Sequence, residues 1–115
     1  ETIAGLRERM GVPLEQLSPW HHVRKGLPPT LVLHGEADPT VKFWTSAAFV
    51  KKMKAAGNDA KLAAYPEELH GFFNYGRRSN KMFIATMRRT DEFLAELGWL
   101  QGQPSIEKFT AAKAR

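Results

Sequence analysis

The chain has 115 residues, of which 43% are apolar, 25% charged and 10% aromatic. This length allows one small domain, and this composition excludes disorder, collagen and coiled coil as the main state. No run of about eighteen apolar residues occurs, so we expect no membrane span. The absence of cysteine excludes disulfides, a cysteine-based zinc site and a thiol nucleophile, but does not choose between cytoplasm and export.

The charge balance is basic, with 17 Lys and Arg against 12 Asp and Glu. Such an excess is typical of proteins that bind nucleic acids or anionic surfaces. However, two of the densest basic stretches, Lys51–Lys54 and Arg88-Arg89, lie inside helical patterns. There, charged residues normally cover the solvated face of a helix, so we expect no nucleic-acid partner.

The first 29 residues are expected to form a short helix and a loop. Ile3, Leu6 and Met10 recur at helical spacing, and Gly11 can end that helix. Four prolines and Gly26 break the stretch from Val12 to Pro29. The chain opens on Glu1 without a starting methionine or a signal peptide, which suggests that upstream residues are missing.

Residues 30–100 are expected to follow the order strand, helix, strand, helix. The continuous apolar run Thr30–Leu33 is typical of a strand buried on both faces, and Ala60–Tyr65 is a second candidate strand. An apolar stripe predicts a helix over Phe43–Ala56, and a similar face predicts another over Asn80–Leu97. Residues 101–115 are predicted to be a loose tail.

A strand–helix–strand unit of this length implies parallel pairing of the two strands. The fold class is therefore α/β. Two strands are too few for a stable parallel sheet, which needs helices on both faces and further strands. We expect the chain to be the end of a larger α/β domain, or to need a partner chain that covers its exposed edge.

The strongest candidate site consists of Asp38, just after the first strand, and His70, in the loop after the second. Both loops emerge at the same edge of a parallel sheet, where the sites of open α/β proteins lie. A carboxylate that orients a histidine is the arrangement a general base requires. Taken singly, Asp38 could be a turn residue and His70 a polar surface residue, and the residues alone leave both alternatives open.

The segments Pro29–Val41 and Tyr65–Phe72 resemble the C-terminal part of an α/β-hydrolase. The most similar branch contains the esterases and acetylxylan esterases, near dienelactone hydrolases and prolyl-oligopeptidase catalytic domains. The resemblance implies the last two strand–helix units of the hydrolase sheet, with Asp38 as the acid and His70 as the base of a Ser-Asp-His triad. It implies no catalytic role for His34-Gly35, to which we assign packing, and no cofactor.

Two departures from the family pattern stand out. The Gly-x-Ser-x-Gly motif of the nucleophile is absent, so we expect the nucleophilic serine to be missing from this chain and the isolated chain to be inactive. Glu67-Glu68-Leu69 replaces the small residues that usually precede the histidine. The implied parent is a serine esterase acting on a small acyl ester. A non-catalytic remnant or interaction module is the first alternative, and a nucleic-acid-binding domain is a weaker one.

Three further residues are candidate substrate contacts: Trp44, Val41 and Phe72. Trp44 lies off the apolar stripe of its helix, and the other two belong to the segments that carry Asp38 and His70. His34 and Asp38 are four residues apart, a spacing that suits metal ligands on a helix. Gly35 and the preceding strand argue against a helix there, so we expect no metal site.

Overall fold

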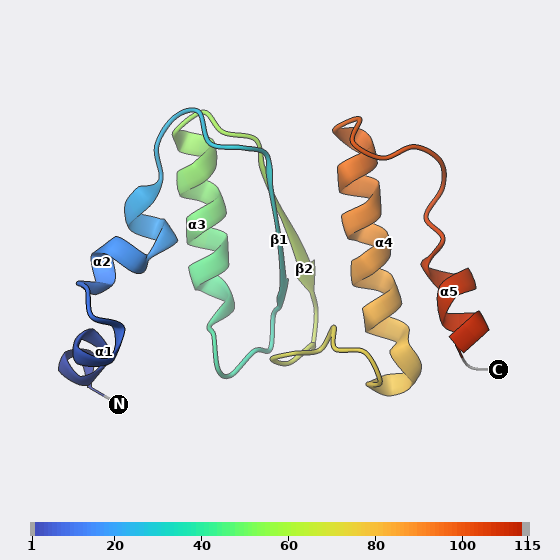
Figure 1. The fold of residues 1–115 in the computed structure, drawn as a ribbon, viewed down its shortest axis with the longest axis horizontal. Coiled ribbons are helices and arrows are strands. Elements are labelled where there is room, and N and C mark those ends of the chain that lie inside the picture. Colours follow the sequence, from blue (N-terminus) through green and yellow to red (C-terminus); the bar gives the residue numbers. More distant parts are fainter. Residues whose placement is uncertain (1, 114–115) are drawn as a thin grey trace.

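The computed structural model describes residues 2–113 (Figure 1). Its elements are α1 (Ile3–Met10), α2 (Leu14–Leu17), η1 (Pro19–His22), β1 (Thr30–Gly35), α3 (Phe43–Ala55), β2 (Ala60–Tyr65), η2 (Arg78–Asn80), α4 (Lys81–Glu96) and α5 (Ile106–Lys113). The expected strand–helix–strand–helix order of residues 30–100 is confirmed, with boundaries that differ by at most two residues.

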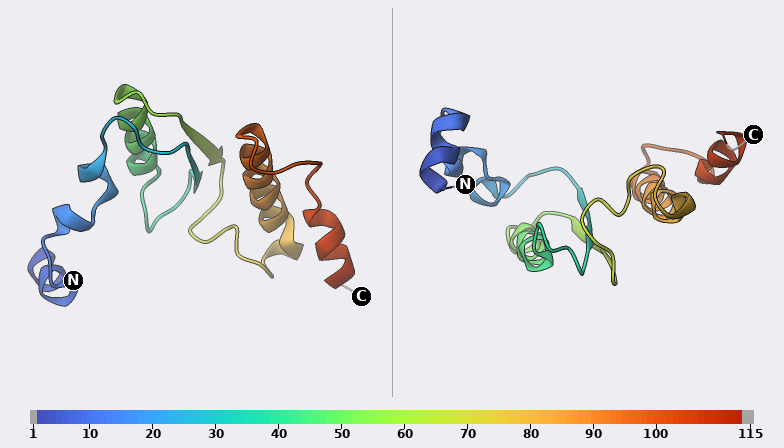
Figure 2. Two further views of the ribbon diagram at one scale, coloured as in Figure 1. Left: turned by 45° about the horizontal axis from the view of Figure 1, so that its top comes forward. Right: turned by 90° about the horizontal axis from the view of Figure 1, so that it is seen from below.

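The sheet consists of β1 and β2, which pair in parallel from Thr30 opposite Ala60 to Gly35 opposite Tyr65. Helix α3 connects them on one side, and α4 returns on the other side (Figures 1 and 2). This arrangement places the carboxyl ends of both strands at one edge. The α/β class and the parallel pairing are therefore confirmed.

A small apolar core lies between the sheet and α3. Val50 and Met53 of the helix and Ala60 of β2 are buried, and Val32 and Leu62 pack against them from the strands. Both helix residues belong to the apolar stripe that predicted α3. Side-chain alternation along the strands explains why Val32 and Leu62, which are paired in register, face the same helix.

The segment before β1 is more ordered than the sequence predicted, because α2 and η1 lie within the expected loop. Pro19 stands in the first turn of η1, where its fixed φ suits a helix and its missing N–H is not needed. Lys52 of α3 donates to the carbonyl of Trp20 at 2.7 Å and lies 4.3 Å from that ring's centroid. The buried Asn58 accepts from the backbone N–H of Leu27 and donates to the carbonyl of Arg24.

The prediction of a loose tail is wrong for residues 106–113, which form α5; Ala114 and Arg115 lie outside the described residues. This helix packs against α4, where Arg88 forms an ion pair with Glu107. Glu107 lies in the first turn of α5, where a negative charge favours a helix. Neither the ion pair with Arg88 nor the charge at the helix terminus is part of an apolar stripe, the pattern that predicted the other helices.

Within residues 2–113 each strand has a neighbour on one side only, and no helix is long and apolar enough to cross a membrane. Several large apolar side chains remain exposed: Trp20, Trp44, Leu69, Phe73, Tyr75, Trp99 and Phe109. The unpaired strand edges could accept further strands, and the exposed apolar side chains could pack against additional chain.

Candidate active site

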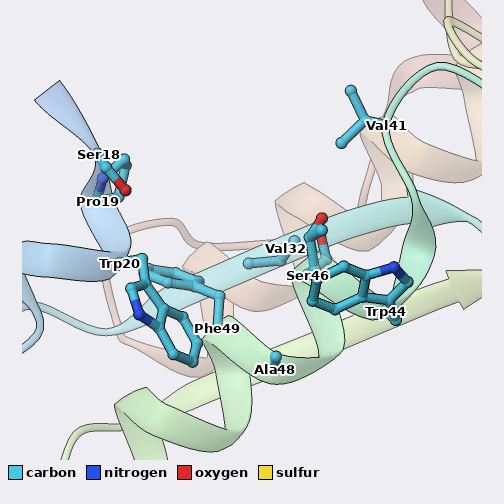
Figure 3. A pocket seen from close by; sticks show the side chains of 10 residues that line it. Ser18, Pro19, Trp20, Val32, Val41, Trp44, Ser46, Ala48 and Phe49 are labelled. Carbon is cyan, nitrogen blue, oxygen red and sulfur yellow. The ribbon is translucent and has the colours of Figure 1, made fainter. Parts of the chain in front are cut away.

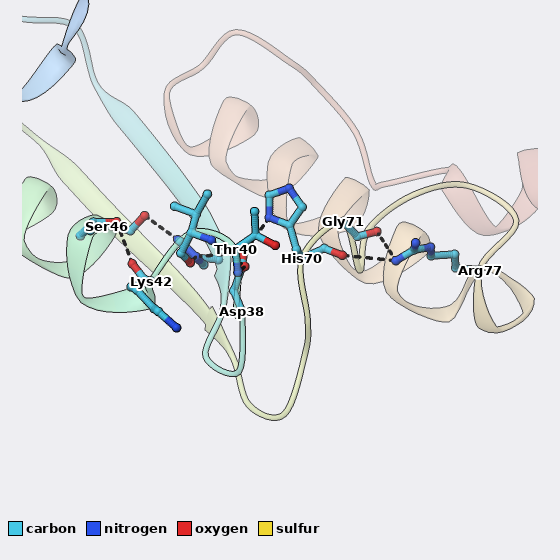
Figure 4. Close-up of polar contacts among 10 residues, drawn as sticks. Asp38, Thr40, Lys42, Ser46, His70, Gly71 and Arg77 are labelled. Atoms are coloured by element: carbon cyan, nitrogen blue, oxygen red, sulfur yellow. Dashed lines mark hydrogen bonds and ion pairs between the residues drawn. The ribbon is translucent and has the colours of Figure 1, made fainter. Parts of the chain in front are cut away.

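The loop after β1 holds Asp38 in a buried position, with 8% of the residue exposed. Its Oδ1 accepts hydrogen bonds from the backbone N–H groups of Thr40 at 2.8 Å and Val41 at 2.9 Å. An aspartate that accepts bonds from residues two and three positions ahead closes a tight local turn. The turn therefore orients the carboxylate, and Oδ2 remains available on its other side (Figure 4).

The loop after β2 brings His70 to this oxygen. His70 Nδ1 lies 2.9 Å from Asp38 Oδ2 (Figure 4). Because a carboxylate accepts, Nδ1 carries the proton in this bond and Nε2 is left as the ring's proton acceptor. The His70 side chain is 54% exposed, whereas that of Asp38 is 6% exposed. The expected meeting of the two residues at one sheet edge is confirmed.

The two loops touch through their backbones at Gly35. Ala37 N–H donates to the carbonyl of Glu68 at 3.1 Å, and Glu36 N–H donates to the carbonyl of Tyr65 at 3.0 Å. A Cβ at residue 35 would lie 2.3 Å from the Glu68 carbonyl oxygen, well inside van der Waals contact. Glycine at this position therefore allows the loops of Asp38 and His70 to come together.

Two arginines hold the histidine loop in place. Arg77 donates to the carbonyls of His70 at 3.2 Å and Gly71 at 3.4 Å, and Arg78 pairs with Glu68 at 2.9 Å. The unusual Glu67-Glu68-Leu69 sequence thus supplies a carboxylate that anchors the loop. Sequence reasoning missed this ion pair, although Glu67-Glu68 before His70 and Arg77-Arg78 after it could have indicated one.

His34, which the sequence assigned to packing, makes hydrogen bonds at both ring nitrogens. Its Nε2 lies 2.8 Å from the Val41 carbonyl oxygen and 3.4 Å from Asp38 Oδ2, and its Nδ1 lies 2.6 Å from Ser46 Oγ. His34 lies at the end of β1, so the helical spacing of metal ligands does not apply. In the described part of the chain, no group of three His, Asp or Glu side chains could hold a metal ion.

The pKa of Asp38 is lowered from 3.8 to about 2. Burial opposes this shift, since it disfavours the charged carboxylate, but hydrogen bonds from Val41, His70 and Thr40 outweigh it. The carboxylate therefore stays ionised at neutral pH. An ionised acid beside the Nδ1 proton of His70 is the state that orients a general base.

Two cavities adjoin the site. The smaller one, of about 220 Å³, is lined by residues that include Asp38, Val41, His70 and Phe72. The larger one, of about 810 Å³, lies between η1, β1 and α3, where Trp20 and Trp44 flank it (Figure 3). Val41 lines both cavities. The structure thus brings Val41 and Phe72 beside His70, whereas Trp44 lines only the neighbouring larger cavity.

A family model of the prolyl oligopeptidase family matches residues 8–101. The chain belongs to this family. The family match confirms the predicted resemblance to the C-terminal part of an α/β-hydrolase.

Solved structures similar to this chain include those of an esterase from the Planctomycetes species Thermogutta terrifontis. The propionate-bound form has a TM-score of 0.83 and 44% identity, covering 88% of this chain and 37% of that one. The form phosphonylated by sarin has a TM-score of 0.83 and 45% identity, covering 87% and 36%. The chain spans little more than a third of the length of these esterase chains. A comparison with curated proteins found no match.

Replacing Gly35 by alanine should separate the two loops. The added Cβ would meet the Glu68 carbonyl at 2.3 Å, and relieving such an overlap costs about 1–3 kcal/mol of stability. We expect a lower midpoint of urea unfolding and a longer Asp38–His70 distance in a crystal structure of the variant. Gly57→Ala is the control: it has a φ of +88° and no atom within 4 Å of the added carbon, so it should lose stability without opening the site. A Gly35→Ala structure that keeps the 2.9 Å bond would contradict this account.

Asp38 should contribute a pH-dependent component to stability. Its pKa falls from 3.8 in the unfolded chain to about 2 in the folded one, so its contribution is complete above about pH 5 and is lost as the pH falls through the folded pKa. Urea unfolding of the wild type and Asp38→Asn at stepped pH values measures it. We expect the stability difference between the two proteins to shrink from pH 4 to pH 2. A difference that stays constant over this range would show that the carboxylate's charge is not involved.

Proposed function

We propose that the chain supplies the acid and the base of a carboxylic-ester hydrolase, with Asp38 and His70 completing a triad whose serine lies outside this sequence. The 2.9 Å bond between the buried Asp38 carboxylate and the exposed His70 ring carries this proposal. Membership of the family and the similarity to an esterase support it. The positions of the two residues also follow the Ser, Asp, His order of α/β-hydrolases.

In the proposed reaction, His70 Nε2 takes the proton of the serine hydroxyl as the serine oxygen attacks the acyl carbon. The same nitrogen then gives this proton to the leaving alcohol, and a water molecule repeats the sequence to release the acid. Asp38 Oδ2 holds the Nδ1 proton, which keeps Nε2 facing the serine and stabilises the imidazolium that forms. The chemistry requires no cofactor.

The serines of this chain do not suit the role of nucleophile. Ser18, Ser46, Ser79 and Ser105 all lack the flanking glycines of a nucleophile turn. Ser46 Oγ is hydrogen-bonded to His34 Nδ1 at 2.6 Å and not to His70. The similar esterase is nearly three times as long as the matched part, so the nucleophile and its oxyanion donors would come from a region that this chain does not contain.

The same missing region is our candidate for covering the open edge of β1. The larger cavity is lined by Val32 of β1 and by Trp20 and Trp44. Further strands of the same domain would pair with β1 and bury this apolar surface. A separate partner chain is the alternative, and size-exclusion chromatography of the complete protein distinguishes the two.

The proposed substrate is an ester with a small acyl group, on a carbohydrate or a similar alcohol. The cavity beside His70 is only about 220 Å³, and Val41 and Phe72 give it an apolar wall. The similar esterase has been solved with propionate and butyrate bound, which are short-chain carboxylates. We assign Trp44, in the adjoining cavity, to the alcohol side of the ester or to the domain interface.

The isolated chain should hydrolyse short-chain aryl esters no faster than the uncatalysed background. No serine here lies in a glycine-flanked turn that would supply oxyanion donors, which acyl transfer needs in addition to a base. Release of the aryl alcohol, followed by absorbance, measures the rate. A robust rate that Ser46→Ala or Ser18→Ala abolishes would overturn the proposal that the nucleophile lies elsewhere.

In the complete enzyme, His70→Ala should lower kcat by several orders of magnitude, because serine activation and proton transfer are both lost. Asp38→Asn should lower kcat on the order of 10⁴-fold, since the neutral amide no longer holds the Nδ1 proton. His21→Ala is the matched control, because this exposed histidine of η1 lies outside the site. If all three variants keep wild-type turnover while folded, the chain is a non-catalytic module.

A further inference from the structure

His34 is buried, with 8% of the residue exposed, and both of its ring nitrogens are bonded. The carbonyl of Val41 can only accept, so Nε2 carries the proton that lies along the 2.8 Å bond. In the neutral ring Nδ1 then accepts, and the Ser46 hydroxyl donates to it at 2.6 Å. The Val41 carbonyl therefore fixes the tautomer of His34 in which the N–H faces the aspartate loop, and Ser46 holds the ring through its other nitrogen.

This ring joins three elements around the proposed acid. His34 stands at the end of β1, Ser46 in the first turns of α3, and Val41 in the loop between them. Phe43 meets the His34 ring edge-on, at 5.6 Å between centroids and 84° between planes. The ring can therefore neither turn nor shift without breaking a hydrogen bond or a packing contact.

Both backbone polar groups of Val41 are hydrogen-bonded within the site. Its N–H donates to Asp38 Oδ1 at 2.9 Å, and its carbonyl accepts from His34 Nε2 at 2.8 Å. The same Nε2 lies 3.4 Å from Asp38 Oδ2, the oxygen that accepts from His70. Both histidines thus approach one carboxylate oxygen, His34 from a buried position and His70 from an exposed one.

We propose that His34, oriented by Ser46, is a positioning residue that sets the direction of the Asp38 carboxylate toward His70. This inference rests on the proposed triad. It differs from the packing role that the sequence suggested for His34, because a side chain of the same volume without an N–H would fill the space but leave the Val41 carbonyl without its donor and Oδ2 without a nearby N–H. Ser46 acts only through His34, since its hydroxyl faces the other side of the ring.

The test uses His34→Leu, His34→Gln and Ser46→Ala in the complete enzyme, with kcat and KM measured per active site. Active sites are counted by the leaving group that an aryl phosphonate releases as it reacts with the nucleophile, so unfolded protein does not enter the rate. We expect His34→Leu to lower kcat about 100-fold with KM little changed, because a misdirected base lowers turnover rather than binding. Ser46→Ala should lower kcat about tenfold.

Two comparisons separate positioning from stability. His34→Gln should recover most of the turnover, because its amide N–H can take the place of Nε2–H. Val50→Ala is the matched control, because it removes buried core volume from α3, the helix that carries Ser46. It should lower the unfolding midpoint and leave kcat unchanged. If His34→Leu behaves like Val50→Ala, or if His34→Gln recovers nothing, the positioning role is wrong.

Double variants identify the path of the effect. Adding Ser46→Ala to His34→Leu, or His34→Leu to Asp38→Asn, should lower kcat by less than about twofold more, because the residues act in one series. Fully multiplicative losses would overturn the inference. Turnover that survives both Asp38→Asn and His70→Ala would instead refute the proposed triad itself, so the two failures are distinguishable.

Discussion

The in-register parallel pairing of β1 with β2 is the constraint on which the rest of the site depends. It aligns Gly35 with Tyr65, so the chain leaves both strands at the same level and the two following loops run side by side. Asp38 comes three residues after β1 and His70 five residues after β2. A shift of one residue in register would move every side chain of one strand to the opposite face and would separate the two loops.

Close contact of the loops also requires a place where two backbones can touch. Gly35 provides it, since any Cβ there would overlap the Glu68 carbonyl. Glu68 makes two of the contacts that hold the loops: its carbonyl accepts from Ala37 N–H, and its carboxylate pairs with Arg78. Arg77 holds the carbonyls of His70 and Gly71, so the exposed histidine is carried by a loop with anchors on both sides.

Burial of a carboxylate is unfavourable unless its oxygens are hydrogen-bonded. Asp38 meets this condition with two backbone N–H groups on Oδ1 and His70 on Oδ2, and its pKa lies at about 2 despite the burial. The negative charge is therefore stable where the proposed mechanism needs it. The neighbouring His34–Ser46 pair extends this network from the loop into β1 and α3.

The sequence alone determined the elements and the placement of the proposed acid and base. Apolar periodicity and glycine or proline boundaries act over a few residues, so they predicted β1, β2, α3 and α4, and parallel topology then predicted that Asp38 meets His70. Tertiary structure decided the contacts between residues far apart in the chain: Arg88 with Glu107 of α5, Lys52 with Trp20 of η1, and Glu68 with Arg78 in the histidine loop. It also showed that His34 makes hydrogen bonds at both ring nitrogens and does not only pack. No local sequence pattern predicts these bonds, because the partners of a polar group depend on which groups the folded chain brings next to it.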